Sequence, residues 1–210
     1  MTATWKESDD IFRPTPVPLG QMLAVIFRTH RKANSTVVLV SDAVMAEIFW
    51  QLKSKGDVEM GGVLVGNAFV DSDMLLHVVA VRRGLLGDNG EGTPVSFKFT
   101  SDSWQSINSK LLGLPAEERN IVGWYHSHPG VKFLTPSSID DRTMRSWIKA
   151  TNKKLLCGIF CQDEQRCYCY YKMGMNAARE SVIWVKPVKA VLSGPVLLGI
   201  CSKKSIRTAN

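Results

Sequence analysis

The stretch GWYHSHPGVKFLTPSSIDDRT, residues 123–143, decides the fold and marks a candidate site. It carries two of the four histidines of the chain, His126 and His128, directly after the apolar residues 121–122, which predict a buried strand. Alternate residues of a strand project from the same face, so the two imidazoles would lie side by side while Ser127 points away. This geometry is suited to chelating a metal ion.

The residues that follow predict a helix and a third ligand. Thr135 as N-cap and Pro136 at the first helical position predict a helix over 136–150. Ser137 and Asp140 lie three positions apart and would be neighbours on its surface. Two imidazoles, one carboxylate and a fourth position open to water make the ligand composition of a catalytic zinc centre. Zinc lowers the pKa of bound water to about 7 and polarises carbonyls, so the stretch predicts hydrolytic chemistry.

The composition predicts one globular domain. The chain has 210 residues, of which 45% are hydrophobic and 21% charged, enough for a substantial core. Its net charge of +7 raises the question of an acidic partner, but the basic residues are scattered and lack interleaved aromatics. We therefore expect neither nucleic acid nor a membrane as partner. The first residues lack a basic segment leading into an apolar run, which predicts a cytoplasmic protein.

Four of the five cysteines lie among strand-forming residues. The odd number argues against a disulfide framework and predicts reduced thiols. The spacing of Cys157, Cys161, Cys167 and Cys169 would also allow a zinc ribbon. Alternation on two strands joined by the loop 162–166 favours buried structural cysteines instead.

The rest of the chain predicts an α/β domain, a mixed β-sheet flanked by helices. Residues 1–34 are interpreted as an N-terminal extension and 35–210 as the domain. Helices are predicted after the N-caps Ser41 and Ser101, over 42–55 and 102–112. A loop is predicted over 84–94. Strands are predicted over 36–40, 61–66, 74–83, 95–99, 118–128, 155–161 and 166–173, with shorter strand-like runs at 182–185 and 196–201.

Three motifs together give a family resemblance. GWYHSHPG, the pair Ser137-x-x-Asp140 and the upstream VEMGGVLVG (58–66), which contains Glu59, resemble the JAMM or MPN-plus family of zinc metalloproteases. That family includes deubiquitinating and deneddylating subunits of the proteasome and signalosome. The resemblance covers about 36–173 and implies a single MPN-like domain of cytidine-deaminase-like architecture.

The spacing departs from the family pattern in one place. The family usually has seven residues between the second histidine and the serine, whereas 129–136 makes eight here. Two registers remain open, Ser137 with Asp140 or Ser138 with Asp141. The first is preferred because the family often has a threonine three residues after its aspartate, and Thr143 occupies that position.

The resemblance implies a role for each motif residue. His126, His128 and Asp140 would bind Zn²⁺, Glu59 would be the general acid/base that hydrogen-bonds the metal-bound water, and Ser137 would help to hold the oxyanion. The implied activity is a zinc-dependent isopeptidase or peptidase that cleaves ubiquitin or a ubiquitin-like protein after its C-terminal glycine. The substrate tail would lie in a groove beside the metal, with walls expected at 84–94 and 129–134.

Two alternatives stay open at this point. The first is an MPN scaffold or binding module that acts through a partner subunit in a larger complex and has little activity alone. The second, suggested only by the net charge, is a member of the family that associates with nucleic acid.

Overall fold

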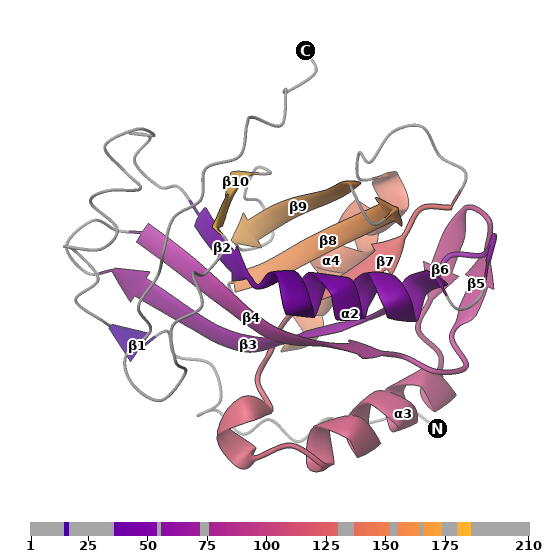
Figure 1. Cartoon of the computed structure of the whole chain (residues 1–210), viewed down its shortest axis with the longest axis horizontal. Helices are drawn as coiled ribbons and strands as arrows, with labels where there is room; N and C mark the ends of the chain where they lie inside the picture. Colours follow the sequence, from indigo (N-terminus) through magenta and orange to yellow (C-terminus); the bar gives the residue numbers. More distant parts are fainter. Residues whose placement is uncertain are drawn as a thin grey trace.

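The computed structural model describes residues 15–16, 36–53, 56–71, 76–129, 137–151, 155–163, 166–173 and 180–185. Their framework is an eight-stranded sheet in the order β1-β3-β4-β2-β10-β9-β8-β7 (Figure 1). Parallel and antiparallel pairs are both present, which confirms the predicted mixed sheet. The strands are β1 (Thr15–Pro16), β2 (Thr36–Val40), β3 (Gly61–Asp71), β4 (Leu76–Leu86), β7 (Ile121–Ser127), β8 (Leu155–Asp163), β9 (Arg166–Met173) and β10 (Glu180–Val185).

The strand pairings close on themselves. Besides its parallel partner β8, strand β7 pairs antiparallel with β3, in a register that runs from Gly61 opposite His126 to Val65 opposite Ile121. The pairings therefore lead from β3 through β4, β2, β10, β9, β8 and β7 back to β3. As a result, the end of β7 that carries the two histidines lies beside the start of β3.

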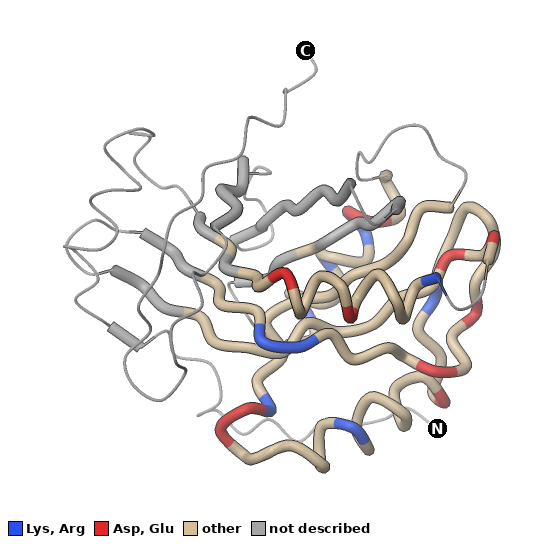
Figure 2. Tube along the Cα trace, in the orientation of Figure 1, with Lys and Arg blue, Asp and Glu red and all other residues tan. Residues whose placement is uncertain are grey.

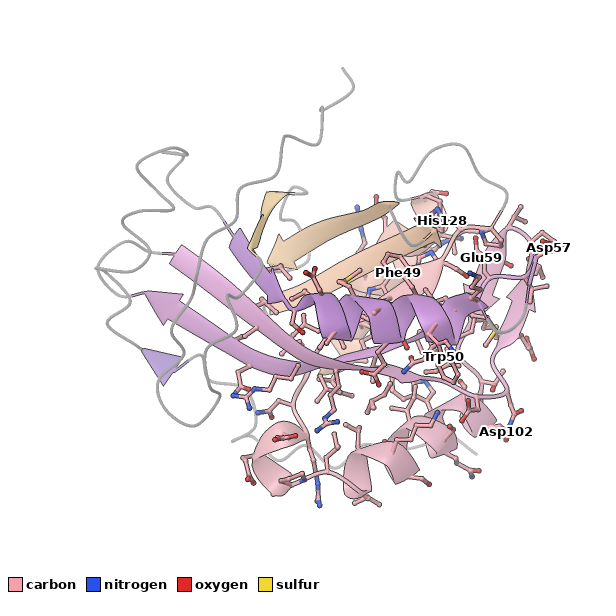
Figure 3. The ribbon with its side chains drawn as sticks, viewed as in Figure 1. Phe49, Trp50, Asp57, Glu59, Asp102 and His128 are labelled. Carbon is pink, nitrogen blue, oxygen red and sulfur yellow. The ribbon has the colours of Figure 1, made fainter. Side chains whose placement is uncertain are left out.

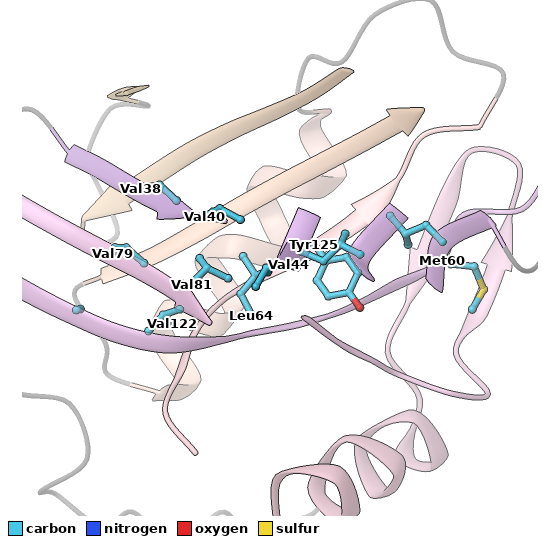
Figure 4. Packing of buried hydrophobic residues seen from close by; sticks show 12 residues of the cluster. Val38, Val40, Val44, Met60, Leu64, Val79, Val81, Val122 and Tyr125 are labelled. Atoms are coloured by element: carbon cyan, nitrogen blue, oxygen red, sulfur yellow. The ribbon is translucent and has the colours of Figure 1, made fainter. Parts of the chain in front are cut away.

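Helix α2 (Asp42–Lys53) covers one face of the sheet. It buries Val44, Ile48 and Leu52, as its predicted apolar face requires. These side chains pack into a core with residues of β2, β3, β4 and β7, among them the fully buried Leu64 and Tyr125 (Figure 4).

Helices α3 (Ser101–Leu112) and α4 (Ser138–Thr151) contribute the cores of the opposite face. Val63 of β3 packs with Ile107 of α3, while Trp124 of β7 packs with Met144 of α4. None of the helices within the described ranges is long and apolar enough to cross a membrane.

An aromatic cluster joins the elements on that second face. Phe99 follows a small hairpin formed by β5 (Glu91–Thr93) and β6 (Ser96–Lys98). The centroid of its ring lies 5.2 Å from the ring centroid of Trp104 in α3 and 5.5 Å from that of Trp147 in α4. Such ring pairs add to the apolar burial energy, so the hairpin, α3 and α4 form one packed unit.

Two local predictions were wrong. Helix α3 begins at Ser101 with Thr100 as its N-cap, because the Thr100 hydroxyl accepts the Ser103 N–H while the Ser103 hydroxyl accepts the Thr100 N–H. The predicted loop 84–94 is partly strand, since β4 continues through Leu86 and β5 occupies Glu91–Thr93. Gly84 lies within β4, where a Cβ would meet the side chain of Ile48 at 2.5 Å, so the packing of α2 on this strand requires a residue without a side chain.

Other predictions reach the limits of the described residues. Helix α4 begins at Ser138 rather than at 136, and the expected cap residues Thr135 and Pro136 lie outside the described ranges. The same is true of the strand-like run 196–201 and of most of the extension 1–34, from which only β1 is described. The predicted hairpin of β8 and β9 is confirmed by its antiparallel register.

Replacing Gly62 tests how tightly β3 is held. A Cβ at Gly62 would collide with the backbone of Leu85 and lie 2.8 Å from the Cα of Leu86. Because backbone atoms cannot rotate away, we expect Gly62→Ala to lower the free energy of unfolding by at least about 2 kcal/mol. Urea unfolding followed by tryptophan fluorescence measures this loss.

The matched control is Gly113→Ala at the end of α3. Gly113 has a φ of −72°, and a Cβ there meets nothing closer than the Lys110 carbonyl oxygen at 3.4 Å. We expect a change within about 0.5 kcal/mol. Equal losses in the two variants would contradict the close packing of β3 against β4.

Candidate metal centre

Three segments of the chain bring four titratable side chains together. Glu59 lies two residues before β3, His126 lies near the end of β7 with His128 directly after it, and Asp140 lies in the first turn of α4. All four are buried, with 2% to 6% of their surface exposed. Figure 3 shows Glu59 and His128 close together at the end of the sheet.

The pairing of β3 with β7 positions Glu59 against the histidines. Gly61 lies opposite His126, and continuing this register by two residues places Glu59 opposite His128. The Glu59 N–H also donates to the Thr93 carbonyl oxygen of the hairpin at 2.8 Å. Consequently, ligand atoms of Glu59, His126 and His128 all lie within 4.8 Å of one another.

The Ser-x-x-Asp pair caps helix α4. The Ser137 carbonyl oxygen accepts the Asp141 N–H at 3.2 Å, and its hydroxyl oxygen accepts the Asp140 N–H at 3.3 Å. In return, the Ser137 N–H and hydroxyl donate to Oδ2 of Asp140 at 2.6 and 2.7 Å. These reciprocal bonds hold the carboxylate at the helix N-terminus, where a negative charge is favoured.

This cap directs Asp140 towards the histidines. Its Oδ1 lies 3.2 Å from Nε2 of His126, and its Oδ2 lies 4.0 Å from Nε2 of His128. Asp140 is buried whereas Asp141 is only half-buried, and Ser137 and Asp140 line the same cavity as the histidines. Of the two registers, the structure therefore brings Ser137 and Asp140 to the histidines.

The arrangement fits a small divalent cation. The Nε2 atoms of His126 and His128 lie 2.8 Å apart, and the carboxylate distances above range from 3.2 to 4.0 Å. Ligands about 2.0–2.1 Å from a tetrahedral ion are about 3.3 Å from one another, which falls within this range. Nitrogen and carboxylate donors are also the set that zinc accepts.

Sequence reasoning missed two residues that orient the site. The indole ring of Trp124 stacks on the His126 imidazole, with ring centroids 4.8 Å apart and planes 6° apart. Because Trp124 packs against Met144 and Ile148 of α4, it fixes the plane of the imidazole. Alternation along β7 could have placed Trp124 on the histidine face. The second missed residue is Thr93, whose carbonyl oxygen accepts the Glu59 N–H. No pattern in the sequence indicated this bond.

Burial and mutual charge separate the pKa values of the two carboxyl groups. Burial, with a smaller contribution from the Asp140 charge, raises the pKa of Glu59 from 4.5 to about 7. Burial also acts to raise the pKa of Asp140, but contacts with His126 and the bonds from Ser137 outweigh it and lower that pKa. Burial lowers the pKa of His126, against the opposing effect of Asp140. A neutral imidazole is the form that binds metals.

The four side chains line a pocket with an apolar mouth. Its other walls come from the hairpin, including Val95 and Phe97, and from α4, including Ile139 and Thr143. Val95 is 74% exposed and Ile139 is 42% exposed. The sequence predicted a wall of the groove at 84–94, but the pocket is lined instead by the residues just after that range, among them Val95 and Phe97. Most of 129–134 lies outside the described ranges.

The raised pKa of Glu59 predicts a pH-dependent stability of the metal-free protein. A carboxyl whose pKa is higher in the folded chain stabilises the fold below its unfolded pKa, and this contribution is lost as pH rises through the folded pKa. In chelator-treated protein, Glu59→Gln should therefore gain stability over wild type between pH 5 and pH 8, by about 2 kcal/mol. Urea unfolding at each pH measures the difference.

Glu117→Gln removes an exposed carboxyl and serves as the control. Its stability relative to wild type should stay constant over the same pH range. A constant difference for Glu59→Gln would contradict the raised pKa.

Comparison with known proteins identifies the family. Residues 41–170, more than half of the chain, match the family model for prokaryotic homologs of the JAB domain. The chain is 29% identical over 119 residues to ubiquitin carboxyl-terminal hydrolase RPN11 of Saccharomyces cerevisiae, covering 57% of this chain and 37% of that protein. It is 27% identical over 93 residues to COP9 signalosome complex subunit 5 of Caenorhabditis elegans, covering 44% of this chain and 24% of that protein.

Two further matches have less informative names. An uncharacterized protein of Caenorhabditis elegans, F37A4.5, is 31% identical over 114 residues, covering 54% of this chain and 34% of its own length. The solution structure of protein DSY2949 from Desulfitobacterium hafniense has a TM-score of 0.48 and 18% identity, covering 73% of this chain and 96% of that one. The chain thus spans well under half the length of these sequence relatives. The matched domain places this chain in the JAB/MPN family, to which RPN11 and COP9 signalosome subunit 5 also belong.

Proposed function

We propose that this protein is a zinc-dependent isopeptidase or peptidase that cleaves ubiquitin or a ubiquitin-like protein after its C-terminal glycine. The observation that carries the proposal is the meeting of Glu59, His126, His128 and Asp140 in one buried pocket. The name of the RPN11 relative, a ubiquitin carboxyl-terminal hydrolase, supports the substrate class.

His126, His128 and Asp140 are proposed to hold the zinc ion. Both histidines present Nε2 to a common point, and the Asp140 carboxylate is fixed there by two hydrogen bonds from Ser137. A zinc ion in such a site supplies a Lewis acid that activates water and polarises the scissile carbonyl. Trp124 and Ser137 would keep the ligand side chains oriented, which is the usual task of residues behind metal ligands.

Glu59 is proposed as the general acid/base. It lies opposite His128 and within reach of the space between the ligands. A carboxyl that changes protonation near neutral pH can take a proton from water and return it to the leaving amine. The different environments of Glu59 and Asp140 agree with this division of roles, because Asp140 favours the ionised form.

Ser137 is proposed as a donor to the oxyanion, a role in which its hydroxyl would turn from Oδ2 of Asp140 to the reacting carbonyl oxygen while its N–H keeps the bond to Asp140. Its side chain lines the pocket beside Asp140 at the N-terminus of α4. A hydroxyl donor in this position would stabilise the negative charge that develops on the carbonyl oxygen. The rim formed by Val95 and Ile139 gives an extended, apolar substrate segment a surface to lie against.

The charge distribution supports a protein substrate over nucleic acid. Figure 2 shows that the Lys and Arg positions are spread over several of the described elements, with Asp and Glu positions among them. Arg83, for example, lies 3.5 Å from Glu118. Action within the cytoplasm, with or without a partner subunit, is part of the proposal.

Cleavage of modifier fusions tests the activity. We expect the protein to release the leaving group from at least one of a panel of ubiquitin and ubiquitin-like fusions, and a zinc chelator should abolish this. Glu59→Gln should lower kcat at least about 100-fold because the general base is lost, while about one zinc per chain stays bound. His128→Ala should lose both the zinc and the activity.

Two results would argue against the proposal. Cleavage that survives the chelator would contradict a metal centre. Full zinc occupancy with no cleavage of any fusion, alone or with cell extract, would favour a scaffold or binding module instead.

A second comparison tests which aspartate binds the metal. Asp140→Asn should weaken zinc affinity by about 10-fold or more, because a charged ligand becomes a neutral amide. Asp141→Asn is the matched control and should leave zinc affinity within about twofold of wild type. Competition with a zinc-binding dye measures both affinities. The reverse order would move the ligand set to the other register.

A further inference from the structure

Ser127 stands between the two histidines of β7 and faces away from their side chains. It is only 8% exposed, although it lines neither the pocket nor a hydrophobic cluster. Its hydroxyl oxygen accepts the Met60 N–H at 2.9 Å, and its own N–H donates to the Met60 carbonyl oxygen at 2.8 Å. Both hydrogen bonds therefore go to the residue next to Glu59.

These two bonds form an altered last rung of the β3–β7 ladder. In a hydrogen-bonded pair of a regular antiparallel ladder, each residue donates its N–H to the carbonyl oxygen of the other. Here the register that pairs Gly61 with His126 would pair Met60 with Ser127. The Met60 N–H nevertheless goes to the serine hydroxyl. Met60 and Ser127 thus remain joined by two hydrogen bonds at the position where β7 ends and the chain turns towards Pro129.

We propose that Ser127 is a positioning residue that sets Glu59 at its working distance from His126 and His128. The role assigned to Glu59 rests on the proposed function, whereas the rung itself rests on geometry. The segment 59–60 has two anchors, the bond from Glu59 to Thr93 on the hairpin and the rung to Ser127 on β7. Only the second anchor joins Glu59 to the strand that carries the histidines.

A hydroxyl is needed at position 127 for this role. Alanine would leave the buried Met60 N–H without an acceptor, at a cost that unpaired buried donors always incur. The backbone bond from residue 127 to the Met60 carbonyl oxygen would remain, so the rung would keep one of its two bonds and the segment 59–60 would be held less firmly against β7. Threonine keeps the hydroxyl and should keep the rung.

The test compares Ser127→Ala, Ser127→Thr and Ser103→Ala in the full chain. Ser103 of α3 is also a buried serine, and its hydroxyl bonds to the Thr100 N–H and carbonyl oxygen. Amide hydrogen exchange at residues 59 and 60 is followed by NMR in each variant. Zinc content, KM and kcat are measured on the same samples.

In Ser127→Ala we expect the amides of residues 59 and 60 to exchange at least about 10-fold faster than in wild type. Both amides report opening of the whole segment 59–60 and not only the loss of one hydrogen bond. Its kcat should fall about 10- to 100-fold, with KM and zinc content within about twofold of wild type. Ser127→Thr should restore both exchange and kcat. Ser103→Ala should lower stability and leave exchange at 59–60 and kcat unchanged.

Failure of the inference is distinguishable from failure of the proposed function. Unchanged exchange at 59–60 in Ser127→Ala overturns the inference, whether or not the wild type is active. Loss of zinc in that variant, as in His128→Ala, also overturns it, because Ser127 would then support the ligands and not Glu59. If the wild type cleaves no fusion, fast exchange in Ser127→Ala with zinc retained still supports the positioning role and leaves the proposed function as the part that failed.

Discussion

The antiparallel pairing of β3 with β7 is the constraint on which the rest of the structure depends. It closes the circuit of strands, and it separates the two main cores, because Leu64 faces α2 while Val63 faces α3. The same pairing sets Glu59 opposite His128. Gly62 shows how closely this region is packed, since a Cβ there would overlap the backbone of β4. The fold and the candidate site are therefore stabilised by the same set of contacts.

Four titratable side chains in one buried place would be costly if each stood alone, because charges lose their hydration there. The structure offsets part of this cost by contacts within the group. Asp140 accepts two hydrogen bonds from Ser137 and lies beside His126, so its charged form is favoured. The described contacts include no comparable hydrogen bonds to the Glu59 carboxyl group. Its raised pKa therefore favours the protonated form. One pocket thus holds two carboxyl groups of different character, as acid/base sites require.

Local patterns predicted the elements well but not how they meet. The apolar run before His126 predicted β7, and the spacing of Val44, Ile48 and Leu52 predicted α2. Glu59 taken alone would read as an exposed loop acid, and only the family resemblance singled it out; its burial follows from pairing with a distant strand. Gly84 reads as a chain breaker in sequence, yet it lies in β4, where a Cβ would clash with Ile48 of the distant helix α2. The N-cap was misplaced by one residue because Thr100 and Ser101 are both good caps. The roles of the individual site residues stay predictions.

The distance along the chain between the paired segments also has a consequence for the order of folding. The hydrogen bond from Met60 to Ser127 spans 67 positions, and Asp140 comes later still. Such a non-local contact forms slowly, because a long loop must close before the contact contributes any stability. Helix α2 and the β3–β4 hairpin need no such closure and can form earlier. A chain still emerging from the ribosome therefore cannot assemble the centre until β3, β7 and the first turn of α4 have all been made. The sequence order alone thus delays assembly of the candidate site until the late part of synthesis, when only β8, β9 and β10 of the described elements remain to be made.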